Sequence, residues 1–411
     1  MKIHFALLLS QQFRKKFIVI DRLVIISIYI ISITKIIAWN EIKKYQLMQL
    51  WMGGDVIMAN FIKREICFLM KNPITYVSVF LMVVIVVITV PPYLEPYAHV
   101  RTDNEPAEYD LDGDIDSGYI PTPIEEWYEV SLEEIKAGLI NDVGLTIEQA
   151  ESEISMMKDN VWDREKIVEY LREEYSLKGA NSVFLLYEYK HATFSEMQQY
   201  LEESFENQTF TKCFSYKYSE FLSLGSVLAA VILFVVLLSR DMKKDIYALL
   251  HTKPFMGSKY VLCKLISGAS VIYMAIAVVT VVMNIIAVKT GNELGLGSNI
   301  FDVWKVVVIY NLPSIILTGC VVIFISLLFK NILPVVPAML IYFIYSNMGA
   351  DITTSGYIYI LRPLGLFIRY TELFTNLSSL NGAVLNQGII CAVAVLLIFI
   401  NSSLWERRRT I

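Results

Sequence analysis

The chain has 411 residues, of which 55% are hydrophobic and only 18% are charged, and its mean hydropathy is +0.51. This composition excludes an ordinary water-soluble globular protein. The formal net charge is −5, but the stretch from Pro91 to Tyr218 holds 28 acidic and 10 basic residues, so it carries −18 and the remainder +13. An acidic stretch of this kind repels phosphate backbones and argues against nucleic acid as a partner.

The first 57 residues give two interpretations. Residues 17–39 are apolar enough to form an extra hydrophobic helix. However, charged residues lie inside this stretch and basic residues flank both of its sides, and charges at that depth in a membrane are costly. Gly53, Gly54 and Asp55 can be encoded by GGAGGTGAT, the form of a bacterial ribosome-binding site, just before Met58. One hypothesis is that translation starts at Met58, and the other is that residues 1–57 contain a genuine anchor helix.

Residues 58–90 are expected to form an amphipathic helix followed by the first span. Ile62, Ile66 and Leu69 recur at helical spacing, whereas Arg64 and Lys71 face the opposite way. Such a basic amphipathic helix lies flat on the inner leaflet of a membrane.

Apolar runs predict six membrane-spanning helices, one in residues 58–90 and five in residues 219–411. The predicted spans are Tyr76–Val90, Phe221–Leu238, Leu262–Val288, Val303–Phe329, Ile332–Tyr345 and Gly388–Leu404. The fold class that follows is an all-α polytopic membrane protein, a six-helix transmembrane bundle, with a small α+β extracellular domain inserted at residues 91–218.

Basic residues set the expected orientation, because they are retained on the cytoplasmic side of a membrane. They precede the first span, and they lie between spans two and three, between spans four and five and after span six: Lys63, Arg64, Lys71, Arg240, Lys243, Lys244, Lys253, Lys259, Lys264, Lys330 and Arg407–Arg409. We therefore expect a multi-pass protein of the plasma membrane, with both termini cytoplasmic if translation starts near Met58.

Local signals predict the elements of the acidic domain. Ser131 with Glu134 and Thr193 with Glu196 have the spacing of capping boxes, the first helix ending at Gly144. A further helix is expected from Asp163 to Lys178. The aromatic and β-branched stretches 182–189 and 210–218 are expected to be neighbouring strands.

The stretch 351–387 is expected to be an extracellular re-entrant segment. It is too polar to span, yet Leu364, Phe367, Ile368 and Leu373 recur at helical spacing. Short interfacial helices dipping into the outer leaflet are the expected structure.

The sequence contains no motif for catalysis or for nucleotide binding. It has no G-x-x-x-x-G-K-[ST], no H-E-x-x-H and no G-x-S-x-G, and its four histidines are scattered. The alternating aspartates from Asp110 to Asp116 do not fit a calcium-binding EF-hand loop, because Ser117 and Pro123 stand where glycine and glutamate are needed. A solvated acidic linker is the preferred interpretation, and weak calcium binding is the alternative. We therefore expect no catalytic site, metal or cofactor on this chain.

The cytoplasmic loop 240–260 is the candidate for contact with a partner. Its sequence R-D-M-K-K-D-I-Y-A-L-L-H-T-K-P places an apolar stripe of Ile246, Leu249 and Leu250 among charges. An exposed apolar stripe of this kind favours a protein partner, and a merely charged loop is the alternative.

From Phe61 onward the chain resembles a permease subunit of ABC exporters of type 2. The resemblance lies in F-I-K-R-E-I-C-F-L-M-K-N-P-I-T-Y before the first span and in R-D-M-K-K-D-I-Y-A-L-L-H-T-K-P-F-M-G-S-K-Y-V-L-C-K-L after the second. Related stretches in the family form an elbow helix, here Ile62, Arg64, Ile66, Leu69 and Lys71, and an ATPase-coupling loop. The loop residues that match are Lys243, Lys244, Asp245, Ile246, Leu249, Leu250, His251 and Lys253. Asp245 and Ile246 depart from the pair that many relatives have.

The resemblance implies an ATP-driven exporter. A separate ABC ATPase subunit would bind ATP and Mg and push on the coupling loop, and a second permease chain, identical or different, would complete the pathway. The alternative is a non-transporting signalling or mechanical protein that acts through its extracellular domain. Asn284, Asn311 and Thr318 lie within spans, where they either line a cavity or, as we prefer, form hydrogen bonds between helices.

Overall fold

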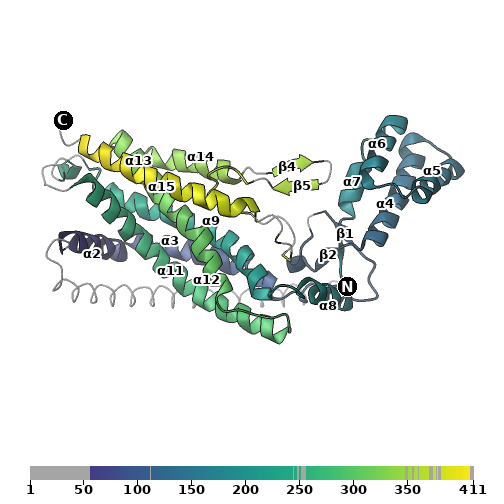
Figure 1. The fold of residues 1–411 in the computed structure, drawn as a ribbon, viewed down its shortest axis with the longest axis horizontal. Coiled ribbons are helices and arrows are strands. Elements are labelled where there is room, and N and C mark those ends of the chain that lie inside the picture. The colour runs from purple at the N-terminus through teal and green to yellow at the C-terminus, as the bar shows by residue number, and fades with distance from the viewer. Residues whose placement is uncertain are drawn as a thin grey trace, which may run out of the picture.

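The computed structural model describes residues 56–111, 113–243, 245–247, 250, 256–347, 350–353, 356–359, 361–369, 374–375, 377 and 381–407. Both hypotheses about residues 1–57 concern a stretch that lies almost wholly outside these residues. The described chain is mostly helical (Figure 1).

Four helices are long and apolar enough to span a membrane, which makes this a membrane protein. They are α9 (Phe210–Ser239), α11 (Gly257–Glu293), the continuous helix of α12 (Asp302–Val306), η4 (Val307–Asn311) and α13 (Leu312–Phe329), and α15 (Asn381–Arg407). A fifth candidate is the pair α2 (Val56–Lys71) and α3 (Pro73–Thr89), which is bent by 74°.

The predicted span at Ile332–Tyr345 is represented by α14 (Val335–Asn347). This helix has 13 residues. It is therefore about 20 Å long, which is less than the roughly 30 Å of a bilayer's hydrocarbon core. By length, α14 falls short of a full crossing.

Helix α9 corrects the prediction of a strand at 210–218. Thr209 caps the helix by accepting a hydrogen bond from the backbone N–H of Lys212, and the helix then continues to Ser239. Phe210, Phe214 and Tyr218 are all fully buried and their rings stack in succession. Their spacing of four residues fits the period of a helix, whereas the prediction of a strand rested on their aromatic content.

The segment between α3 and α9, here called the polar region, contains short helices around a small sheet. Its sheet has the antiparallel order β1-β3-β2. Its elements are η1 (Pro91–Leu94), β1 (Tyr109–Asp110), η2 (Ile115–Ser117), β2 (Tyr119–Pro121), α4 (Ile124–Gly138), η3 (Leu139–Val143), α5 (Ile147–Asp159), α6 (Arg164–Tyr175), α7 (Ala180–Leu186), β3 (Tyr189–His191) and α8 (Phe194–Ser204). Helices α4 to α7 share a hydrophobic cluster of their own.

Several predictions for the polar region are confirmed. The capping box of Thr193 and Glu196 starts α8. Asp163 caps α6, although this helix ends at Tyr175 rather than at Lys178 because Ser176 adopts a left-handed conformation. The helical segment that begins with α4 ends at Gly144, whose φ of 85° suits glycine.

Two predictions for the polar region are wrong. Ser131 is not a cap, because α4 starts seven residues earlier at Ile124 and Ser131 is buried inside it. The stretch 182–189 is not a strand, because α7 occupies Ala180–Leu186 and buries Ala180 and Phe184 at a spacing of four. Strand β3 starts only at Tyr189.

The predicted interfacial helices at 351–387 are also wrong for the described residues. Strands β4 (Ala350–Thr353) and β5 (Gly356–Tyr359) pair as an antiparallel hairpin. Residues 361–369 are irregular, with Leu364 at a φ of +60°. The left-handed conformation of Leu364 directly after Pro363 is incompatible with a right-handed helix starting there. Leu373 lies outside the described residues.

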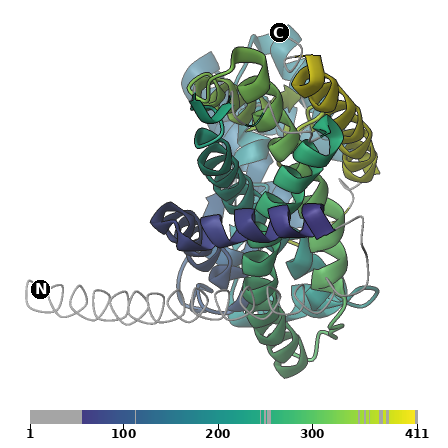
Figure 2. The same ribbon diagram turned by 90° about the vertical axis from the view of Figure 1, so that its left-hand side faces the viewer.

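The long helices run side by side and the polar region projects from one end of them (Figure 1). We call this end the domain end. At the opposite end, here the α2 end, α2 crosses the other helices (Figure 2). Helix α9 packs against α3, α11 and α13. The ring of Phe234 on α9 fits against Gly268 of α11 and Gly319 of α13, where an added Cβ would lie 2.4 and 2.6 Å from ring atoms.

Candidate functional site

Helix α2 has the amphipathic character that its sequence predicts. Ile66 and Leu69 are buried, Ile62 is half-buried, and Arg64 and Lys71 are exposed. The helix ends where Asn72 caps α3, with the Asn72 side chain accepting a hydrogen bond from the N–H of Ile74. The 74° bend between α2 and α3 lies at this cap, directly before Pro73.

The apolar face of α2 also carries a buried charge that the sequence analysis missed. The side chain of Glu65 is 3% exposed, and its Oε1 atom lies 3.1 Å from Nζ of Lys264 on α11. Lys264 is fully buried and its Nζ lies 2.5 Å from Oδ2 of Asp241. Arg240, at the end of α9, contacts both Glu65 and Asp241. Two carboxylates and two cations therefore balance, as buried charges must.

We call Glu65, Arg240, Asp241 and Lys264 the charge cluster. Its members come from α2, from the end of α9 and the residue after it, and from α11, so it joins the three segments. Aromatic rings cover its cations: Phe68 lies 4.7 Å from Cζ of Arg240, and Phe61 and Tyr260 flank Lys264. These ion pairs connect the elements that supply the charges, although Oε2 of Glu65 and Nζ of Lys264 are buried without a hydrogen bond of good geometry.

Helix α15 joins the same arrangement through its last turns. The hydroxyl of Tyr260 donates to Asp241 at 3.0 Å, and its ring stacks on Trp405 with centroids 3.7 Å apart. The backbone N–H of Gly257 donates to Glu406 at 3.1 Å. Four segments that are distant in sequence thus meet at the α2 end.

The predicted coupling residues lie directly after the charge cluster. Lys243 and Asp245 are exposed, while Ile246 and Leu250 are half-buried and Leu250 packs against the main hydrophobic core. The apolar stripe is thus partly used within the chain. Lys244, Leu249, His251 and Lys253 lie outside the described residues.

The preferred interpretation, hydrogen bonds between helices, is confirmed for Asn311 alone of the three polar side chains inside the long helices. Asn311 and Ser219 exchange two bonds, at 2.8 and 3.1 Å. Asn284 donates to the carbonyl of Ile300 at 2.9 Å, and Thr318 donates to the carbonyl one turn before it at 2.7 Å. These groups connect the helices or satisfy their own backbone.

At the domain end, an aromatic cluster connects the polar region to the long helices. The ring of Phe374 lies within 6.2 Å of the rings of Tyr93, Phe205 and Phe210. Oδ1 of Asp114 accepts a hydrogen bond from the N–H of Phe374 at 3.1 Å, so a carboxylate of the polar region fixes the segment before α15.

The same carboxylate pairs with a cation of α9. Oδ2 of Asp114 lies 3.3 Å from Nζ of Lys217. Burial and the charge of Asp114 raise the pKa of the neighbouring Asp116. We call the contacts around Asp114 and Phe374 the domain joint.

A second ion cluster holds the polar region together. Nζ of Lys190 lies 2.6 Å from Glu126 and 2.8 Å from Glu196. Burial alone would raise the pKa of Glu196, but its hydrogen bonds with Lys190 and Thr193 outweigh burial and hold that pKa below its usual range.

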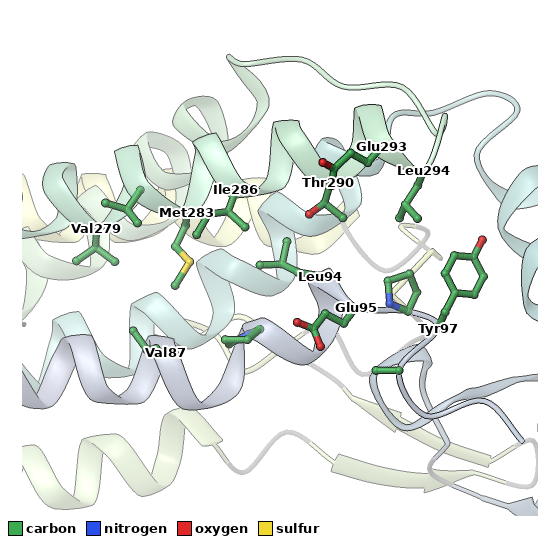
Figure 3. A pocket seen from close by; sticks show the side chains of 14 residues that line it. Val87, Leu94, Glu95, Tyr97, Val279, Met283, Ile286, Thr290, Glu293 and Leu294 are labelled. Atoms are coloured by element: carbon green, nitrogen blue, oxygen red, sulfur yellow. The ribbon is translucent and has the colours of Figure 1, made fainter. Parts of the chain in front are cut away.

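A groove with a volume of about 660 Å³ separates α3 from α11 at the domain end. Its inner walls are apolar, with Val87 on α3 and Val279, Met283 and Ile286 on α11. Glu95 and Glu293 lie at one end of the groove, on opposite walls (Figure 3).

In the part of the chain that the structure describes, no group of three or more His, Cys, Asp or Glu side chains is arranged to hold a metal ion. Asp112, in the aspartate run, is not among the described residues. No protein family, curated protein or solved structure gave a match to this chain. The charge cluster and the groove are therefore interpreted from their own chemistry.

Proposed function

We propose that this chain is the membrane-spanning permease subunit of an ATP-driven ABC exporter, energised by a separate ATPase subunit. The observation that supports this proposal most is the charge cluster. It joins α2, α9, α11 and, through Tyr260, α15 at the point where the candidate coupling residues begin. A force applied to the residues after Asp241 is therefore transmitted to several long helices at once.

The proposal includes a topology of six crossings, with α14 as the fifth. The α2 end is then cytoplasmic, because exposed basic residues such as Arg64, Lys243 and Lys330 gather there. The acidic polar region is then an extracellular α+β domain. The membrane is the plasma membrane of a bacterium. ATP and Mg would bind only to the partner ATPase.

The proposal also includes a second permease chain. Helix α15 has apolar side chains that the other described residues leave uncovered, including Leu385, Leu396 and Phe399, each more than half exposed. Lipid or another permease subunit would cover this face.

The test is affinity purification of the tagged chain from gently solubilised native membranes. We expect a co-purifying subunit with a Walker motif. The charge swap Lys243→Glu/Asp245→Lys at two exposed positions should release that subunit. The matched control is Lys289→Glu/Glu293→Lys, which swaps an exposed pair at the domain end and should retain it. Intact complexes that contain no ATPase would reject the proposal.

A second candidate function is a non-transporting mechanical protein that moves its extracellular domain. One observation favours it: Asn284, Asn311 and Thr318 form hydrogen bonds within the protein, so these side chains are already used for packing. The domain joint also gives the long helices a direct connection to the polar region.

The two candidates differ in whether a compound crosses the membrane. Inside-out vesicles that contain the complex should accumulate a compound when ATP is added if the chain is an exporter. Vesicles with an ATPase whose Walker lysine is replaced provide the control. ATP turnover that alters protease cleavage in residues 97–208, with no compound accumulated, would favour the mechanical protein.

A further inference from the structure

The groove at the domain end has the size and the walls of a small-molecule site. Its volume of about 660 Å³ is within the range of ligand pockets, roughly 300–1,000 Å³. Val279 and Met283 form part of its floor and are almost fully buried, whereas Ile286 at its edge is 40% exposed. The groove is therefore a recess between two helices that is open along one side.

The charged residues that line the groove are of one sign. Among the described residues that line it, Glu95 and Glu293 are the only charged ones, and no Lys, Arg or His is present. Both carboxylates are exposed. Glu293 has one weak partner, Lys289 at 3.5 Å, and both members of this pair are largely in solvent. An exposed pair of this kind holds its carboxylate only loosely.

The apolar walls and the carboxylates are separated along the groove. Val87, Val279 and Met283 lie toward the middle of the long helices, while Glu95, Thr290 and Glu293 lie where the helices end (Figure 3). A ligand that fills this groove needs an apolar body and a positive group at one end. The polar region adds to the selection, because residues 91–218, which hold its charged side chains, have a net charge of −18 and attract cations to this end of the molecule.

We propose that the groove between α3 and α11 binds a lipophilic cation, with its apolar body against Val87 and Met283 and its charge between Glu95 and Glu293. Anionic lipids and lipophilic anions are disfavoured by the same carboxylates. The proposal concerns binding and stands without the partner ATPase, so its failure would leave the exporter proposal untouched.

The test is equilibrium binding of radiolabelled tetraphenylphosphonium to the full chain in phosphatidylcholine nanodiscs. Empty nanodiscs measure partition into lipid. Tetraphenylborate has nearly the same shape and the opposite charge, so it measures what the cation's charge contributes. We expect saturable binding of the cation, no saturable binding of the anion, and weaker cation binding at high salt.

Variants locate the site. Glu95→Gln/Glu293→Gln should weaken cation binding by about tenfold or more, because two carboxylates next to the bound charge are lost. Glu148→Gln/Glu173→Gln removes two exposed carboxylates of the polar region and should change binding less than about twofold. Ile286→Trp should also reduce binding by filling the groove.

Three results would overturn the proposal. They are equal binding of tetraphenylphosphonium and tetraphenylborate, cation binding that does not exceed that of empty nanodiscs, and equal losses in the two double variants. The last result would mean that the whole acidic region attracts cations and that the groove does not.

Discussion

Replacing Lys264 by methionine is the most direct test of the charge cluster. Lys264 is fully buried and lies 2.5 Å from Asp241 and 3.1 Å from Glu65. The variant Lys264→Met keeps a similar volume but leaves two buried carboxylates with only Arg240 to neutralise them. Removing one partner from a buried ion pair costs about 3–5 kcal/mol. Because Arg240 remains in contact with both carboxylates, we expect the lower end of that range.

The reactivity of the Cys263 thiol measures this destabilisation directly. It is fully buried, and its Sγ lies 3.9 Å from the carbonyl of Met58 on α2. A maleimide can reach this thiol only when α2 separates from α11. A cost of about 3 kcal/mol raises the population of the open state by roughly 100-fold. The labelling rate of a variant with Cys263 as its sole cysteine, in nanodiscs, should rise by the same factor.

Two controls make the result specific. Lys259→Met removes an exposed lysine from the same helix and should change the labelling rate less than about twofold. Adding Glu65→Gln to Lys264→Met removes one charge of each sign, so the double variant should be less open than the sum of its single variants. Unchanged labelling in Lys264→Met, or strictly additive effects, would refute the reasoning.

Two further predictions concern packing and pH. Gly268→Ala should destabilise the helices by about 1–3 kcal/mol, because its Cβ would meet the ring of Phe234 at 2.4 Å. Adding Phe234→Leu should restore much of the melting temperature in detergent. A Gly268→Ala variant as stable as the original chain would contradict this packing. The second prediction is that acid loosens the polar region. The pKa of Glu196 is held below its ordinary value of 4.5, so its stabilising contribution is complete above that pH and is lost as pH falls through the lower, folded-state pKa. Pepsin cleavage in residues 97–208 should therefore increase below about pH 4.5, and Glu196→Gln should make cleavage depend less on pH. The same dependence of cleavage on pH in both proteins would contradict this prediction.

Hydropathy predicted the positions of the long helices well, because a continuous apolar run has few alternatives in a membrane. It was less informative outside them. Phe210 and Tyr218 belong to a stretch whose aromatic residues suit strands and whose spacing of four suits a helix, and the helix is what forms. After Pro363 the spacing was helical, but Leu364 adopts a left-handed conformation and residues 361–369 are irregular.

The charge cluster was missed because Glu65 was given no role, and Arg240 and Lys264 were used only to set the expected orientation. Glu65 lies three residues after Ile62 and four before Leu69, within the apolar stripe of its helix. Lys264 similarly interrupts an apolar run. Opposite charges embedded in two apolar stripes indicate a buried pair. The sequence does not reveal that these two stripes face each other, since their residues are almost 200 positions apart.

The domain joint can form only late in synthesis, because its two sides are far apart in the chain. Asp114 and the N–H of Phe374 are separated by 260 positions. At a synthesis rate of 5–20 residues per second, the partner of Asp114 emerges on the order of 10–50 s after it. During that interval the rings of Tyr93, Phe205 and Phe210 lack the ring that covers them. A nascent chain that stops before Phe374 therefore presents an uncovered aromatic surface outside the membrane helices, where chaperones and proteases that recognise unfinished proteins can act.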